Sequence, residues 1–114
     1  MDMSTEEVGK DLVIMVNEKR IDAAVAVVFK QKMQDMAKHP ASRVVLDLSQ
    51  VEFLDSSGLG AIVGAMKQLG QDRKLDLAGL TPTVEKVFRL TRMDTVFKIY
   101  PGRSAALPDV ANAS

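Results

Sequence analysis

Apolar positions recur along the chain with two different periods, and their succession predicts alternating strands and helices. The segment DLVIMVN, 11–17, is apolar at neighbouring positions, which is typical of a strand buried on both faces. From Asp22 to about Lys38 the apolar residues return at spacings of four, four and three. This spacing predicts an amphipathic helix with Asp22 as its N-cap. A weaker pattern at 5–8 suits an edge strand that precedes both elements.

The second half of the chain repeats this alternation. A compact apolar run that begins at Arg43 predicts a central strand. Beyond it the helical period sets in at Leu59, and Gly70 is placed to end that helix. The remaining predicted elements are a strand at 74–79, a helix with Thr81 as N-cap and Pro82 as its first residue that reaches Thr91, and a last strand at 96–100.

Strands joined by helices in this order predict an α/β fold with parallel crossover connections. A chain of 114 residues is long enough for one domain with a core of its own and too short for two ordinary ones. We therefore expect a single domain over residues 1–100. The stretch 101–114 is rich in proline, glycine and small residues, which predicts a flexible C-terminal tail.

Composition and charge narrow the functional classes. The chain has 15 basic and 15 acidic residues, so no net charge attracts it to nucleic acid or to an anionic membrane. It has no cysteine, which excludes disulfides, thiolate metal sites and a thiol nucleophile. No apolar run approaches the roughly 20 residues of a membrane span, and no signal peptide is evident. We expect a cytoplasmic protein that recognises its partners through local shape and charge.

The stretch VEFLDSSGLG, 51–60, places two serines where a strand gives way to a helix. A hydroxyl there lies near unsatisfied helix N–H groups, which can stabilise an oxyanion. A general base is missing, because the single histidine, His39, is predicted at the end of another helix, and the serines lack the glycines of a GxSxG elbow. SSGLG also lacks the lysine of a P-loop and the third glycine of a dinucleotide fingerprint. Neither a hydrolase nor a nucleotide site is predicted.

Two interpretations of these serines remain open. Asp55, Ser56 and Ser57 are all favourable N-cap residues, so helix capping alone accounts for them. Alternatively, a serine here is a substrate, because a phosphate adds roughly 1.5 to 2 negative charges where the helix dipole favours them by roughly 0.3 to 1 kcal/mol. The domain would tolerate the phosphate, whereas a partner surface shaped around a neutral hydroxyl would not. The residues alone do not separate Ser56 from Ser57.

Two stretches carry a resemblance to the STAS domain of bacterial anti-sigma-factor antagonists: VVLDLSQVEFLDSSGLGAIVGAMKQL and KLDLAGLTPTVEKVFRLTRMDTVFKIY. They match that domain in the order of elements and in the DSSGLG motif, and the resemblance covers roughly residues 5–100. It implies a STAS-type mixed β-sheet with helices packed mainly on one face.

The resemblance also implies a partner switch without enzymatic activity or a cofactor of its own. In the family, the first serine after the aspartate, Ser56 in this chain, is phosphorylated by a GHKL-type serine kinase that is also an anti-sigma factor. Unphosphorylated protein binds this kinase and frees the sigma factor, phosphorylation weakens the complex, and a metal-dependent PP2C-type phosphatase restores it. ATP and magnesium belong to these partners. The free protein is expected to be a monomer.

Family positions suggest which residues contact the partner. Asp55 would cap the helix and present Ser56, while Ser57, Gly58 and Leu59 would form the first-turn surface that the kinase contacts. Asp22 keeps a family position near the partner surface, although plain capping explains it equally well.

One departure from the family concerns charge. Lys19-Arg20 stands where many relatives have a glycine and an acidic residue, which predicts a compensating acidic patch on an unusual partner. An alternative is a constitutive STAS scaffold, a subunit of a larger signalling or transport complex, in which Ser56 only caps its helix.

Overall fold

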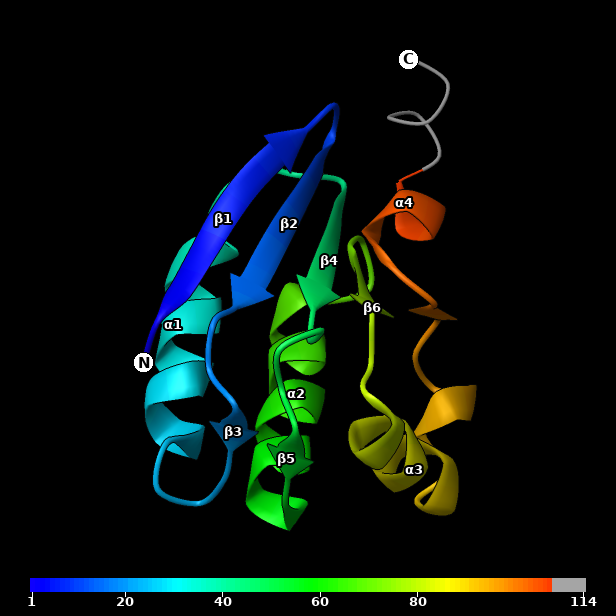
Figure 1. Ribbon diagram of the computed structural model, residues 1–114. Coiled ribbons are helices and arrows are strands. Elements are labelled where there is room, and N and C mark those ends of the chain that lie inside the picture. The colour runs from blue at the N-terminus through cyan, green and yellow to red at the C-terminus, as the bar shows by residue number, and fades with distance from the viewer. Residues whose placement is uncertain (108–114) are drawn as a thin grey trace.

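The protein, a computed structural model that describes residues 1–107, is built on a five-stranded mixed sheet (Figure 1). The strand order is β1-β2-β4-β6-β7, and only the β1–β2 pair is antiparallel. This confirms the predicted mixed α/β sheet. The strands are β1 (Met3–Val8), β2 (Asp11–Val16), β4 (Arg43–Asp47), β6 (Lys74–Ala78) and β7 (Ile99–Tyr100).

Three helices cover one face of this sheet: α1 (Ala26–Met36), α2 (Ser56–Leu69) and α3 (Pro82–Leu90). The apolar faces of these helices pack on the inward residues of the strands to form the main core. The helices contribute Phe29, Ile62 and Phe88, each fully buried. The opposite face carries a smaller cluster around Val13 and Val45. Alternate side chains of a strand point to opposite faces, which is why β2 and β4 are apolar at consecutive positions.

The start of α1 differs from the prediction. The helix begins at Ala26 with Val25 in the N-cap position and without a side-chain cap. Asp22 instead closes a turn, because its Oδ1 accepts from the Ala24 N–H at 3.1 Å and its carbonyl accepts from the Val25 N–H at 3.1 Å. The prediction of Asp22 as helix N-cap was therefore wrong.

Thr81 was also expected to cap its helix, and the structure assigns it a different bond. The residue occupies the N-cap position of α3 with Pro82 in the first turn, but no side-chain cap bond forms. The Thr81 hydroxyl donates to the Val51 carbonyl at 2.7 Å, which ties the start of α3 to the loop after β4.

The last strand is shorter than the predicted segment 96–100. A 3-10 turn, η1 (Met93–Thr95), follows α3, and within the predicted segment 96–100 only Ile99 and Tyr100 pair with β6. Phe97 turns into the core, where its ring packs edge-on against Phe88 with 5.8 Å between centroids. The apolar pattern of this segment thus reflects an anchoring aromatic residue as much as a strand.

Residues 101–107 do not form the flexible tail predicted from their composition. They contain α4 (Arg103–Ala106), which lies on the face of the sheet opposite the other helices, and Ala106 and Leu107 are buried there. Ala106 and Leu107 pack on the sheet, whereas Ser104 and Ala105 remain exposed. The rest of the predicted tail, 108–114, lies outside the described residues.

Arg43 fastens α4 to the sheet. Its guanidinium donates to Asp11 at 2.7 Å, to Asp76 at 3.2 Å and to the Ala106 carbonyl at 2.6 Å. The hydrogen bond to Asp11, helped by Asp76, raises the pKa of Arg43 above its usual value despite partial burial. The otherwise costly burial of Asp76 is thereby compensated.

A second, two-stranded sheet was not predicted from the sequence. It pairs β3 (Arg20–Ile21) with β5 (Phe53–Leu54) in parallel, beyond the ends of β2 and β4. The backbone N–H groups of Glu52 and Phe53 both donate to the Lys19 carbonyl, at 2.7 and 3.1 Å. This small sheet brings the segments before α1 and α2 side by side, so it positions the site described next.

Candidate functional site

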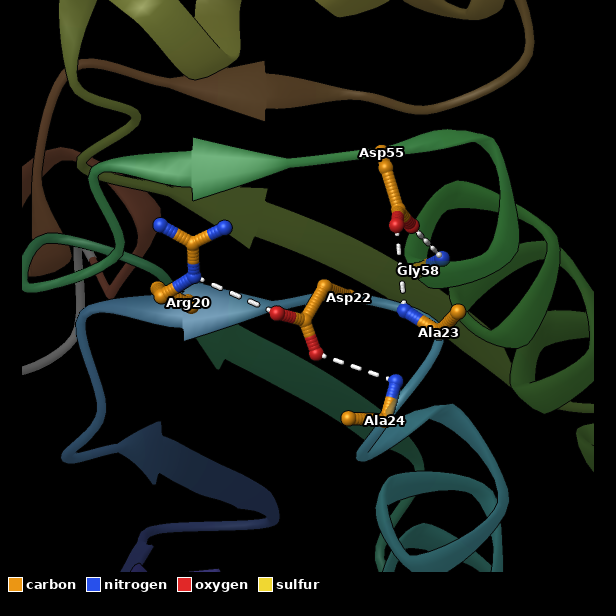
Figure 2. A network of polar contacts seen from close by, with 6 residues as sticks. All are labelled: Arg20, Asp22, Ala23, Ala24, Asp55 and Gly58. Carbon is orange, nitrogen blue, oxygen red and sulfur yellow. Dashed lines mark hydrogen bonds and ion pairs between the residues drawn. The ribbon is translucent and has the colours of Figure 1, made fainter.

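Asp55 links the start of α2 to the segment before α1 (Figure 2). Its Oδ1 accepts from the Gly58 N–H at 2.9 Å, which is a side-chain N-cap bond and confirms that Asp55 caps the helix. Its Oδ2 accepts from the Ala23 N–H at 3.0 Å. One carboxylate therefore fixes the relative position of two loops that are far apart in sequence.

These bonds also set the ionisation of the Asp55 carboxylate. Hydrogen bonds from the backbone N–H of Gly58, then of Ala23 and Ser57, lower its pKa, and the positive charge of Arg20 adds to the effect. A carboxyl group whose folded-state pKa lies below its unfolded value stabilises the fold above the unfolded pKa. That contribution is lost as the pH falls through the folded-state pKa, so the site is held in its capped form at neutral pH.

Arg20 and Asp22 form a charged pair beside this cap. Arg20 Nε donates to Asp22 Oδ2 at 3.2 Å (Figure 2). The central carbon of the guanidinium lies 4.2 Å from the centroid of the Phe53 ring. The Arg20 side chain is 61% exposed and that of Asp22 is 22% exposed. The second sheet thus presents a cation held by a carboxylate and an aromatic face, at a surface from which a partner can reach the guanidinium.

The two serines are the first residues of α2, and both are exposed. Ser56 borders a shallow groove of about 560 Å³ that runs along α2 towards α1 and η1. Leu59 is half-buried and lines the same groove, with Val63 one turn further on. Of the residues that line it, only Ser56 and Leu59 were predicted from the sequence as functional.

Gly58 is buried, so it cannot supply the partner surface that the family resemblance implied for it. A Cβ atom at this position would lie 2.1 Å from the Ile21 carbonyl oxygen and 2.8 Å from Leu54 Cδ1. The residue has to be glycine because β3 and β5 pass directly against the first turn of α2. Its role is to let the second sheet approach the helix that carries the serines.

Gly60 and Gly64 have the spacing of a close-packing motif, but the structure gives them different surroundings. A Cβ atom at Gly60 would meet nothing within 4 Å, whereas one at Gly64 would lie 3.0 Å from Lys30 Cε. Gly60 therefore leaves the groove open next to Ser56. Gly64 leaves room for the side chain of Lys30, which comes from α1 and lies against α2. Sequence spacing alone does not separate these two situations.

His39, the remaining candidate for a general base, lies at another part of the molecule. Its Nε2 is 2.6 Å from Glu7 Oε1 on β1. In the part of the chain that the structure describes, no His, Asp and Glu side chains gather in a group of three that would hold a metal ion. No helix of that part combines the length and the apolar character that a membrane span requires.

Comparison with known proteins assigns the family. The STAS domain family model matches residues 2–106. A relative from Thermotoga maritima, provisionally named an anti-sigma factor antagonist, is 32% identical over 102 residues, which are 88% of this chain and 90% of the relative. The chain belongs to the STAS domain family.

Solved structures show the same fold. An anti-sigma factor antagonist from Mycobacterium paratuberculosis superimposes with a TM-score of 0.85 at 27% identity, covering 96% of this chain and 93% of that one. The Bacillus cell fate determinant SpoIIAA, in its phosphorylated form, superimposes with a TM-score of 0.68 at 21% identity, covering 96% of this chain and 99% of its own. The latter likeness is one of fold.

Proposed function

We propose that this protein is an anti-sigma factor antagonist, a binding protein and not an enzyme, which is switched by phosphorylation of Ser56. One observation carries the proposal: Ser56 is an exposed hydroxyl at the first position of α2, beside an open groove, directly after the capping residue Asp55. Relatives of similar length are named anti-sigma factor antagonists, and a structural neighbour was solved in a phosphorylated form. These names and the exposed serine support the same role.

The position of Ser56 explains how a phosphate can be added without unfolding the domain. At the N-terminus of α2 the added negative charge meets the favourable end of the helix dipole. The Asp55 carboxylate already accepts from the Gly58 N–H, so the cap is retained when the neighbouring hydroxyl is modified. Phosphorylation therefore changes the charge of the surface and leaves the fold in place.

The proposed partner is a serine kinase of the GHKL type that is also an anti-sigma factor. It binds the neutral Ser56 surface and transfers the γ-phosphoryl group of ATP to the hydroxyl oxygen, which gives up its proton, while ADP leaves. It then dissociates because the phosphate is not accommodated in the complex. A PP2C-type phosphatase removes the phosphate and restores binding. ATP and magnesium are supplied by these partners. The partner surface comprises Ser56, Ser57 and Leu59, with Asp22 and Asp55 holding the adjacent loop.

The assignment of Ser56 is tested by phosphosite mapping in which the purified partner kinase, ATP and Mg²⁺ are incubated with the wild type, Ser56→Ala and Ser57→Ala. We expect stoichiometric labelling of the wild type and of Ser57→Ala, and loss of labelling in Ser56→Ala. Undiminished labelling of Ser56→Ala would refute the site. Tight binding of a kinase that labels none of the three proteins would favour the constitutive scaffold.

Arg20 is proposed to contact an acidic patch of the partner. The guanidinium is largely exposed and is oriented by Asp22 and Phe53, so it is presented in a defined direction. Arg20→Glu is expected to weaken the complex with the kinase about tenfold, because the glutamate and the acidic patch repel each other. The effect should be larger at low ionic strength, since salt screens this repulsion. Lys86→Glu on α3, also exposed, is the matched control. Calorimetric affinities that are equal for the wild type and Arg20→Glu at low salt would contradict the contact.

A further inference from the structure

A second groove of about 560 Å³ lies at the opposite end of α2 from Ser56. It is bordered by the last turn of α2, by Gly70, by the first half of β6 and by Val96 and Lys98 before β7. The two grooves share Lys67, but none of the other residues that line this one also lines the groove beside Ser56. A ligand of this groove is therefore considered separately from the proposed partner switch.

The ionisable residues that line this groove are mostly basic. Lys67, Arg73, Lys74 and Lys98 contribute positive charge, and among residues 1–107 Asp76 is the only acidic residue that lines it. The Asp76 carboxylate is directed to Arg43, at 3.2 Å, and the residue is only 5% exposed. The chain as a whole has equal numbers of acidic and basic residues, so the excess of positive charge at the groove does not reflect a basic composition of the whole protein.

The three lysines are available to a ligand. Each is exposed, and none forms an ion pair within residues 1–107. Lys98 Nζ lies 5.5 Å from the Tyr100 ring centroid, a contact that leaves its charge unneutralised. Arg73 is held in place by the Ala37 and His39 carbonyls, at 2.6 and 2.9 Å, and likewise faces no carboxylate there.

The basic residues surround an apolar floor. Leu75 of β6 is buried at its base, Met66 of α2 is half-buried, and Val96 is 49% exposed. Because β7 pairs only with Leu77 and Ala78, the first half of β6 has no neighbouring strand on this side in the part of the chain that the structure describes. Lysines at such an edge discourage strand pairing, and Lys67 suits the end of α2, but neither role explains an exposed valine among them.

We propose that this groove binds a small amphiphilic anion, a carboxylate carried on a short alkyl chain. The carboxylate is held among Lys67, Lys74 and Lys98, and the alkyl chain lies on Met66, Leu75 and Val96. A volume of this size accommodates a small ligand, and the mixture of an apolar floor with a few charged groups is typical of ligand sites.

The test is a pair of NMR titrations of the full chain at neutral pH, with octanoate and with octanol, below their aggregation concentrations. Octanoate is expected to shift the amide signals of the groove, including Gly70 and Leu75, and to bind at least tenfold more tightly than octanol. The double variant Lys74→Gln/Lys98→Gln should lose about tenfold in octanoate affinity, whereas Lys86→Gln on α3 should not. Val96→Asp should abolish binding.

Three outcomes would overturn the proposal: octanoate and octanol binding equally well, octanoate shifts located away from the groove, or a double variant with wild-type affinity. Each variant is shown to be folded if the signals of its residues outside the groove match those of the wild type. Because the experiment uses no kinase, its failure would leave the proposed partner switch untouched.

Discussion

Ser56→Asp is expected to weaken the complex with the partner kinase about a hundredfold. A carboxylate at this position places a negative charge in a contact surface that accommodates a neutral hydroxyl, and burial of an unpaired charge costs several kcal/mol. A loss of about 2.7 kcal/mol corresponds to a factor of 100 in the dissociation constant. Isothermal titration calorimetry of the wild type and the variant against the same kinase measures the difference.

Ser56→Asn is the matched control, because asparagine has the size and shape of aspartate without its charge. It should retain affinity within a few-fold of the wild type. Ser56→Asp should unfold at the same urea concentration as the wild type or slightly above it, since Ser56 is exposed and a negative charge there is favoured by the dipole of α2. The uncharged Ser56→Asn should unfold at the same urea concentration as the wild type. Equal affinities of Ser56→Asp and the wild type for the kinase would end the case for a charge switch.

The long elements of the fold were predictable because their information is local. β2 and β4 are apolar on both faces, and the apolar period of α2 ends at Gly70, whose positive φ of 77° suits glycine. A cap at this point was also predictable, since Asp55, Ser56 and Ser57 are all favourable N-cap residues, and the structure assigns the role to Asp55. In each case a few neighbouring residues determine the outcome.

The features that were not predicted depend on residues far apart in sequence. β3 and β5 are two residues long, too short for a periodic pattern, and they form where the segments that contain Arg20 and Phe53 meet across the fold. Asp22 was misassigned because an aspartate carboxylate accepts hydrogen bonds from nearby backbone N–H groups both in a turn and at the start of a helix. Residues 103–107 resembled a tail in composition, and their packing was not predictable because Ala106 and Leu107 lie against a sheet face that only the complete fold provides.

The site shows the same division. The family resemblance points to Ser56 and Asp55, but the groove beside Ser56 is also lined by Lys30 from α1 and Met93 from η1. Gly58 was assigned to a contact surface by position in the motif, whereas its surroundings place it inside the fold. A motif residue can therefore be essential for the site without touching the partner.

Gly58→Ala tests this conclusion and should strongly destabilise the protein. The added Cβ would lie 2.1 Å from the Ile21 carbonyl oxygen, which belongs to the backbone and cannot rotate away as a side chain would. Either β3 or the first turn of α2 has to move, and overpacking of this kind costs about 3 kcal/mol or more. Urea unfolding followed by circular dichroism should show a much lower free energy of unfolding than that of the wild type.

Gly60→Ala, two residues later in the same helix, is the matched control. Its Cβ would meet nothing within 4 Å, and alanine is favoured over glycine inside a helix by about 1 kcal/mol, so this variant should be slightly more stable than the wild type. The two substitutions add the same methyl group to the same helix with opposite effects, because only one position faces the second sheet. If Gly58→Ala were as stable as Gly60→Ala, β3 would not pack against α2 as described, and the geometry that presents Ser56 would have to be revised.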